Sequence, residues 1–409
     1  MNRTSTRAAL VVLVCGIVVL ILSFGIRTSF GIFNIPVSQS LGLGRETFAL
    51  AMAVQNLVWG LAQPFAGAIA DRYGPGRVVA ICAAMYAAGL FLMAQASTPE
   101  GLIFSTGVLI GLALSGTGFP VILAVIARSV NERQRSLFLG IGSAGGSSGQ
   151  LLMVPAAHLL INGFGWAAAL LVLAIITMLS VPLAAAFAGR GGGSTTGLLG
   201  DQSITEAAHE AGQHPGYWYL TAGFFVCGFH VAFIATHLPA FIADNGGSAA
   251  IGAAALAVIG LGNIFGSLAC GFLGGRYSKK YMLSGLYLAR ALVFAGFMLV
   301  PLSDASILVF SAIIGMLWLG TVPLTSGLVA QIFGVRYMAM LFGFVFFSHQ
   351  LGSFMGAWLG GYIYDRTGSY DLVWWISVAL GLIAALLHWP IEERPVARLA
   401  RISHQVAPN

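Results

Sequence analysis

Residues 67–77 read GAIADRYGPGR and join two long apolar stretches of the chain. Residues 271–280, GFLGGRYSKK, stand between two later apolar stretches, 204 positions further on. That spacing is close to half of the 409-residue length, and it predicts an internal repeat. Glycines support the repeat, because Gly140 and Gly149 recur as Gly343 and Gly352 at an offset of 203.

The composition is that of a membrane protein, with 58% hydrophobic and only 8% charged residues. Soluble domains carry about 25% charged residues, so this chain could not cover a water-facing surface. A membrane-spanning helix needs roughly 20 apolar residues. The stretches that meet this need are 8–37, 46–70, 78–97, 101–127, 135–161, 165–188, 215–243, 250–274, 281–302, 305–331, 338–364 and 371–390. We therefore expect an all-α integral membrane protein with twelve transmembrane helices in two pseudo-symmetric six-helix bundles.

A polar, Gly- and Ser-rich segment divides these stretches into two groups of six. We expect an N-terminal bundle at 1–188, a linker at 189–214 and a C-terminal bundle at 215–409. With both termini on one side, fifteen of the nineteen Lys and Arg residues fall on that side and two on the other. Because positive charge concentrates in cytoplasmic loops, the sequence predicts a multi-pass protein of the cytoplasmic membrane with both termini inside.

Several classes of function are disfavoured. The net charge of +6 is spread over short loops, so nucleic-acid binding is not expected. The four cysteines all lie in apolar stretches, where packing explains them. No metal-ligand cluster, Walker loop, nucleophile elbow or dinucleotide fingerprint occurs in a suitable context. We expect no enzyme activity, no cofactor and no metal, and a monomer that works in the lipid bilayer.

The segment 67–77 resembles the signature loop between helices 2 and 3 of the major facilitator superfamily. That resemblance covers almost the whole chain and implies alternating access by rocking of two bundles. It also implies a gating role for charged residues at the cytoplasmic helix ends, here Asp71, Arg72, Arg77 and Arg276. The alternative is a simple topological stop signal. In the second copy Gly275 replaces the Asp, so we expect that copy to latch more weakly.

Two arginines, Arg27 and Arg290, are the only charged residues deep inside the apolar stretches. An ionised group in the bilayer core is costly and usually faces a cavity, a partner or a ligand. Two buried cations without a buried acid predict a path for a negatively charged solute.

The segment 25–33 around Arg27 resembles helix 1 of the monocarboxylate transporter family, which has a lysine at this place, and the chain as a whole resembles the bacterial branch of that family. Helix 5 is similar to that family as well, through Arg135, Leu137, Gly140 and Ala144-Gly145. The resemblance implies that Arg27 engages the carboxylate of the substrate, for which guanidinium offers a two-pronged match. The alternative is an arginine that reaches to the outer interface.

The chain departs from that family in helix 8. The family has an aspartate there and, four residues on, an arginine that binds the carboxylate; the matching positions are Asn263 and Ser267. A charged anchor on helix 8 is therefore not expected, and Asn263 remains as a hydrogen-bond donor to the solute. Arg290, in helix 9, either contacts substrate or makes structural hydrogen bonds.

Histidines are the candidates for carrying a proton, because their charge changes near neutral pH. His230 and His349 lie in helices that line the cavity in this superfamily, and each could instead be structural. The full set of candidate substrate-binding residues is Arg27, Phe33, Gln55, Asn56, Phe119, Gln150, Asn263, Thr325 and His349. For most of the aromatic members, packing is the simpler explanation.

The leading hypothesis is a secondary active transporter that moves a small organic anion, a monocarboxylate, together with a proton. A carboxylate and a proton form a neutral load, which avoids about 2.3 kcal/mol per charge per 100 mV of membrane potential. The first alternative is an efflux transporter for an anionic or neutral drug-like compound or secreted metabolite. The second is a membrane receptor that senses a ligand without transport.

Overall fold

The computed structural model describes residues 3–42, 45–189 and 202–399, and within these ranges the chain is helical, without strands. The N-terminal bundle consists of α1 (Arg3–Leu41), α2 (Arg45–Tyr73), α3 (Pro75–Ala94), α4 (Pro99–Leu102), the π-helix η1 (Ile103–Leu109), α5 (Ile110–Thr117), α6 (Phe119–Ser129), α7 (Glu132–Phe164), α8 (Trp166–Met178), α9 (Ser180–Leu183) and the 3-10 helix η2 (Ala184–Phe187). The C-terminal bundle consists of α11 (Pro215–Asp244), α12 (Ala249–Leu273), α13 (Lys279–Leu299), α14 (Asp304–Leu317), α15 (Thr321–Phe333), α16 (Met338–Thr367) and α17 (Asp371–His388).

Eleven helical spans of the described residues are long and apolar enough to cross a membrane. The twelfth span of the fold is α2, which has 29 residues but is not among those eleven. Its polar side chains include Gln55, Asn56, Gln63, Asp71 and Arg72. Because α2 packs against η1 and α5 of its own bundle and against α16 of the other bundle, many of these groups face protein and not lipid. The chain is thus a multi-pass membrane protein with twelve helices in two bundles.

Two helices expected to be continuous are interrupted, so the prediction is wrong at these places. The predicted helix 101–127 breaks at Gly118, whose backbone is extended, with φ −83° and ψ 177°. The predicted helix 305–331 breaks between α14 and α15, next to Trp318. A proline follows each break, Pro120 and Pro323. Proline lacks the N–H that continues helical hydrogen bonding.

The glycines of the repeat sit where helices of the two bundles touch. A Cβ atom at Gly140 of α7 would lie 2.5 Å from the Cα atom of Gly271 in α12. At the repeated position, a Cβ atom at Gly343 of α16 would lie 3.1 Å from Pro64 in α2. Small residues let membrane helices approach closely, and here they do so at two equivalent crossings.

The second pair of repeated glycines faces inward within each bundle. A Cβ atom at Gly149 would lie 2.6 Å from the carbonyl oxygen of Ile21 in α1. At Gly352 it would lie 1.9 Å from the carbonyl oxygen of Phe225 in α11. Gly149 therefore allows α7 to pack closely against α1, and Gly352 allows α16 to pack closely against α11. Because α1 and α11 are the first helices of their bundles, this equivalence confirms the repeat.

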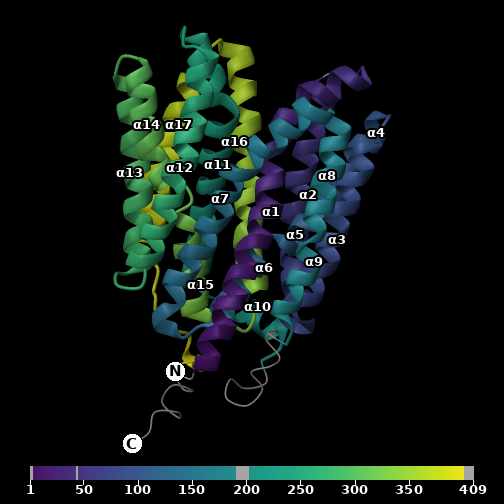
Figure 1. The fold of residues 1–409 in the computed structure, drawn as a ribbon. Helices are drawn as coiled ribbons and strands as arrows, with labels where there is room; N and C mark the ends of the chain where they lie inside the picture. Colours follow the sequence, from purple (N-terminus) through teal and green to yellow (C-terminus); the bar gives the residue numbers. More distant parts are fainter. Residues whose placement is uncertain (1–2, 43–44, 190–201, 400–409) are drawn as a thin grey trace, which may run out of the picture.

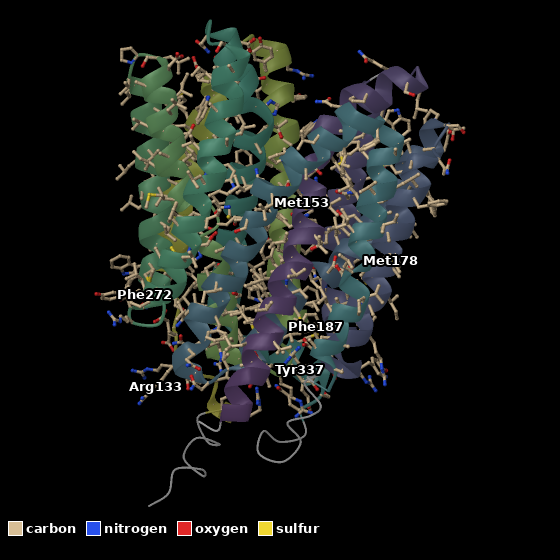
Figure 2. All side chains as sticks on the ribbon, in the orientation of Figure 1. Arg133, Met153, Met178, Phe187, Phe272 and Tyr337 are labelled. Carbon is tan, nitrogen blue, oxygen red and sulfur yellow. The ribbon has the colours of Figure 1, made fainter. Side chains whose placement is uncertain are left out.

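The two bundles meet at one end and diverge toward the other (Figure 1). We call the end where they meet the base; α1 and α3 begin there, and α2 and α17 end there. Helix α7 begins at the base beneath the C-terminal bundle and slants away from it, as the positions of Arg133 and Met153 show (Figure 2). This structure is therefore a state that is closed at the base.

The predicted linker contains a short helix, α10 (Ile204–Gly212), and residues 190–201 of that linker lie outside the described residues. Ser203 caps α10, and its backbone N–H donates a hydrogen bond to the carboxylate of Glu206. That bond holds the pKa of the Glu206 carboxyl below its usual range.

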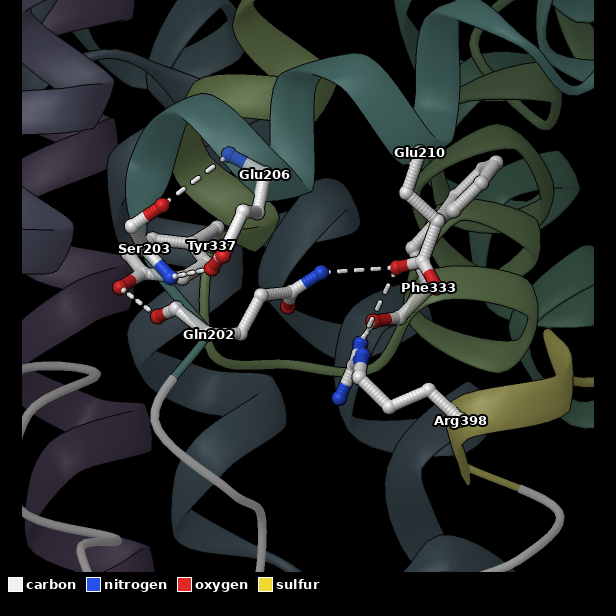
Figure 3. Close-up of polar contacts among 7 residues, drawn as sticks. All are labelled: Gln202, Ser203, Glu206, Glu210, Phe333, Tyr337 and Arg398. Carbon is white, nitrogen blue, oxygen red and sulfur yellow. Dashed lines mark hydrogen bonds and ion pairs between the residues drawn. The ribbon is translucent and has the colours of Figure 1, made fainter.

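Helix α10 and the end of the described chain dock on the same part of the C-terminal bundle (Figure 3). The hydroxyl of Tyr337 donates to the carbonyl of Gln202 at 2.7 Å. Arg398 donates both to the Glu210 carboxylate and to the carbonyl of Phe333, each at 3.3 Å. The α15–α16 connection is thus held at the base by two separate segments.

Candidate functional site

Arg27 is directed between α1 and α2. One of its terminal nitrogens donates to the side-chain oxygen of Asn56, and its guanidinium lies 5.1 Å from the centre of the Trp59 ring. Its side chain is half-buried. A cation over the face of Trp is attracted by the ring's quadrupole. This geometry differs from that of an arginine reaching for the outer interface.

The ring of Trp59 connects this arginine to the other bundle. Its indole N–H donates to Gln63 at 2.9 Å, and the amide of Gln63 donates to the carbonyl of Ser115 at 2.7 Å. These bonds fix the ring within the N-terminal bundle. The same ring packs against Phe346 of α16, with ring centres 5.0 Å apart. The Trp59 ring therefore lies in contact both with Arg27 and with a residue of the C-terminal bundle.

His349 of α16 also packs against Phe346. The two rings are stacked at 5.4 Å with an angle of 7°. The imidazole is 8% exposed, and its Nδ1 lies 3.2 Å from the side-chain oxygen of Gln350. The amide of Gln350 donates to the backbone carbonyl of Asn56 at 3.5 Å. Arg27 contacts Asn56 directly, whereas His349 is joined to them only through intervening side chains, Phe346 and Trp59 on one route and Gln350 on the other.

Arg27 carries a positive charge that no acidic side chain of the described residues pairs with. In the part of the chain that the structure describes, the salt bridges are Arg128–Asp71 and Arg398–Glu210, and neither involves Arg27. The Nε atom of Arg27 is buried without a hydrogen-bond partner. A half-buried guanidinium that has no carboxylate partner among the described residues can still take a charged hydrogen-bond acceptor.

Arg290, the other deep arginine, has a different environment. It is 1% exposed and donates to the backbone carbonyls of Leu317 and Trp318, where α14 ends. Asn263 holds the other side of the same break, because its side-chain oxygen accepts the N–H of Leu319 at 2.9 Å. The arginine thus satisfies carbonyls that the broken helix leaves open, which is the structural alternative for this residue.

The amide of Asn263 also crosses between the bundles. It donates to the hydroxyl of Ser147 in α7 at 3.0 Å. Ser267 lies 3.5 Å from the oxygen of Asn263. The hydrogen-bonding groups of Asn263 are therefore engaged with protein in this state.

Three further candidates are buried inside the N-terminal bundle. Gln55 donates to the carbonyl of Thr106 at 2.8 Å, on a different side of α2 from Asn56. Phe33 packs edge-on against Phe30, and Phe119 packs edge-on against Phe24. None of the three is among the residues gathered around Arg27.

The remaining candidates are spread over other helices. His230 is buried, lies 2.9 Å from the carbonyl of Ser377 in α17 and meets the ring of Phe294 edge-on. Thr325 is fully buried on α15, and Gln150 is half-buried on α7. His230 thus lies among α11, α13 and α17, within the C-terminal bundle.

A second polar cluster, which we call the latch, ties the bundles together at the base. The carboxylate of Asp71 is fully buried, and it accepts from Arg128 at 2.6 Å and from the backbone N–H of Met340 at 2.9 Å. Arg128 also donates to the carbonyls of Val335 and Arg336, at 3.3 and 3.4 Å. Asp71 therefore bonds directly to the start of α16, where the helix dipole favours an anion.

The other predicted gating residues lie outside the latch. Arg72 is exposed and packs over the ring of Tyr73, and Arg276 is exposed over the ring of Phe272. Arg77 is exposed at the start of α3. Arg128 was not among the predicted gating residues, although its place directly after a predicted helix was a usable signal.

At the second copy of the repeat, the bundles meet through backbone and small side chains. Gly275 stands where the first copy has its aspartate, and a Cβ atom at Gly274 would lie 2.8 Å from the hydroxyl of Ser136. The close approach of Gly140 to Gly271 lies next to this contact. The base is thus closed by a charged contact on one side and a glycine contact on the other.

Comparisons with known proteins agree with this architecture. The sequence profile of the Major Facilitator Superfamily matches residues 15–357. The chain is 24% identical to the oxalate:formate antiporter of Oxalobacter formigenes, over 96% of this chain and 94% of that protein. It is 25% identical to monocarboxylate transporter 13 of Rattus norvegicus, over 90% of this chain and 86% of that protein. Its fold is similar to that of the proton:xylose symporter XylE bound to 6-bromo-6-deoxy-D-glucose, with a TM-score of 0.72 at 14% identity, covering 98% of this chain and 100% of that chain. The chain therefore belongs to the Major Facilitator Superfamily.

Proposed function

We propose that this protein is a secondary active transporter that moves a small organic anion, a monocarboxylate, across the cytoplasmic membrane together with a proton. The names of two relatives, a monocarboxylate transporter and an oxalate:formate antiporter, support carboxylates as the solute class. The excess of Lys and Arg on one side supports cytoplasmic termini, which makes the base the cytoplasmic end.

The single observation that carries the proposal is the position of Arg27. Its guanidinium is half-buried between α1 and α2, close to the seam of the bundles, and its hydrogen bond goes to the neutral Asn56. A substrate carboxylate replaces that amide oxygen and gains a charge-assisted, two-pronged contact. Asn56 is then released to donate to the solute from its amide nitrogen.

His349 is the proposed proton carrier. It is stacked on Phe346, and its Nδ1 lies 3.2 Å from Gln350, which bonds to the backbone of Asn56, so a chain of side chains joins it to the Arg27 site. Protonation of the imidazole adds a second cation beside an incoming anion and strengthens its binding. Return to the neutral form weakens the anion's hold and favours release.

The latch supplies the conformational part of the mechanism. Asp71 and Arg128 bond to the start of α16 and the preceding loop in the state that is closed at the base. Rocking of the bundles breaks these bonds and opens the base. Alternating access then exposes the Arg27 site first to one side of the membrane and next to the other.

Binding measurements on the purified protein test the solute class. Lactate, pyruvate and benzoate should raise the melting temperature, because a ligand that binds the folded state stabilises it. Benzamide, which has the shape of benzoate without its charge, should not. Arg27→Gln should abolish the benzoate effect, and Arg366→Gln, which removes an exposed arginine that packs over Tyr362, should retain it. Equal stabilisation by benzoate and benzamide would refute an anion site.

Transport direction separates the proposal from the efflux alternative. Proteoliposomes with an inwardly directed proton gradient should accumulate a labelled carboxylate that binds, and an uncoupler should abolish the accumulation. Uptake driven by the opposite gradient would assign proton antiport and export. Binding without any flux would favour a receptor.

A further inference from the structure

A cavity at the base, separate from the Arg27 site, is unexplained by the transport mechanism. Its volume is about 470 Å³, and its walls come from the start of α7 in the N-terminal bundle and from α15 and the α12–α13 connection in the C-terminal bundle. The charged lining residues are Arg133, Arg135, Arg276, Lys279, Glu132 and Glu393. Four cations and two acids leave an excess of positive charge in a space that touches both bundles.

Several polar atoms of this lining lack partners. The hydroxyl oxygens of Ser136 and Ser278 and the Nε atom of Arg135 are buried without a hydrogen bond in the described chain. Ser136 is only 5% exposed, so the bulk of its side chain is shielded from water. Buried polar groups are nearly always satisfied, and three unsatisfied ones around one cavity indicate a missing acceptor.

Glu393, which lines the cavity, shows that an anion can be held at this site. Its carboxylate takes the backbone N–H of Lys280 at 2.7 Å, at the first turn of α13. The hydroxyl of Ser278, at the N-cap of this helix, makes no capping bond. Helix N-termini favour anions through their free N–H groups and dipole. One carboxylate is thus already held there, while the lining cations outnumber the acids.

We propose that this cavity binds a phosphate group, which bridges the two bundles and stabilises the state closed at the base. A tetrahedral oxyanion offers enough oxygens for Arg135, Lys279 and the two serine hydroxyls together, whereas a monocarboxylate offers two. The phosphate belongs either to a soluble ion or ester or to the headgroup of an acidic lipid. This proposal is independent of Arg27 and of the transported solute.

Thermal unfolding of the full-length protein tests it. In lipid-free neutral detergent, inorganic phosphate should raise the melting temperature in a saturable way if the ligand is soluble. In nanodiscs, a higher melting temperature in phosphatidylglycerol than in phosphatidylcholine, without an effect of free phosphate, would assign the lipid headgroup. No stabilisation from either source would overturn the proposal.

Variants locate the effect. Arg135→Gln should weaken the phosphate or lipid effect about tenfold or more in apparent affinity, as expected for loss of a charged hydrogen bond. Ser278→Ala, which removes one hydroxyl and little packing, should weaken it less and guards against misfolding of the first variant. Arg77→Gln, which removes an exposed cation at the same end outside the cavity, should leave it unchanged. An equal response from Arg135→Gln and the unaltered protein would exclude this cavity.

Discussion

The latch at the base makes a quantitative prediction for Asp71→Asn. The substitution keeps the shape of the side chain and an oxygen that can accept the N–H of Met340, but it removes the charge. Arg128, whose side chain is 6% exposed, is then shut off from water without its counter-ion whenever the base is closed. When the bundles separate, water reaches the guanidinium and removes most of this penalty.

The magnitude follows from the burial of the pair. Breaking a buried ion pair by removing one partner costs about 3–5 kcal/mol. Taking about 3 kcal/mol as the part that applies only to the closed state, the ratio of closed to open molecules falls about 100-fold, at 1.4 kcal/mol per factor of ten. A protein that is almost wholly closed at the base would become about half open.

Spin labels at two exposed residues of the base, Arg77 in the N-terminal bundle and Tyr277 in the C-terminal bundle, report this equilibrium as a distance distribution. Asp71→Asn should move a large fraction of molecules to a longer distance. Arg72→Gln is the matched control, because it removes the neighbouring charge, which is exposed and outside the latch. An unchanged distribution in Asp71→Asn would refute the latch, and so would an equal shift in the Arg72 variant.

Three other predictions follow from single residues. His349→Gln should flatten the pH dependence of uptake, because this imidazole is the proposed proton carrier. His230→Gln, inside the C-terminal bundle, should leave it intact, and a retained profile in the His349 variant would remove His349 from coupling. Gly67→Ala should open the base, because the added Cβ atom would lie 2.4 Å from the carbonyl oxygen of Ala339 in the other bundle. Overpacking of this kind costs about 1–3 kcal/mol. The same spin-label distances measure the opening. Arg290→Gln should lower the free energy of unfolding by about 1.5–3 kcal/mol through lost charged hydrogen bonds, which a lower melting temperature would show. Carboxylate affinity should be retained. Lost affinity at normal stability would assign Arg290 to the substrate site and not to a structural role.

The fold could be predicted from the sequence because hydropathy, the repeat and the loop at 67–77 point to the same answer. Helix α2 was also predicted, at 46–70, although its polar side chains place it outside the apolar spans found in the structure. Its lipid exposure is reduced by packing against α16, which composition does not reveal. The breaks at Gly118 and Trp318 were missed because the apolar stretches continue through them, and a proline inside a membrane-spanning helix is tolerated in many cases.

The site could be predicted only in part. Burial cost alone identified Arg27, but the same argument applied equally to Arg290, and only contacts distinguish the two. Gln55 and Asn56 were both predicted to contact the solute, whereas adjacent residues on a helix point about 100° apart and face different neighbours. Arg128 was counted only as a loop charge, since its partnership with Asp71 joins residues far apart in sequence.

A structure of the protein with a bound carboxylic acid, determined by cryo-electron microscopy, tests the central claim most directly. The account predicts density for the carboxylate at hydrogen-bond distance, about 3 Å, from the terminal nitrogens of Arg27, with His349 and Gln350 on its other side. Density for the acid at another place, with Arg27 still bonded to Asn56, would contradict it.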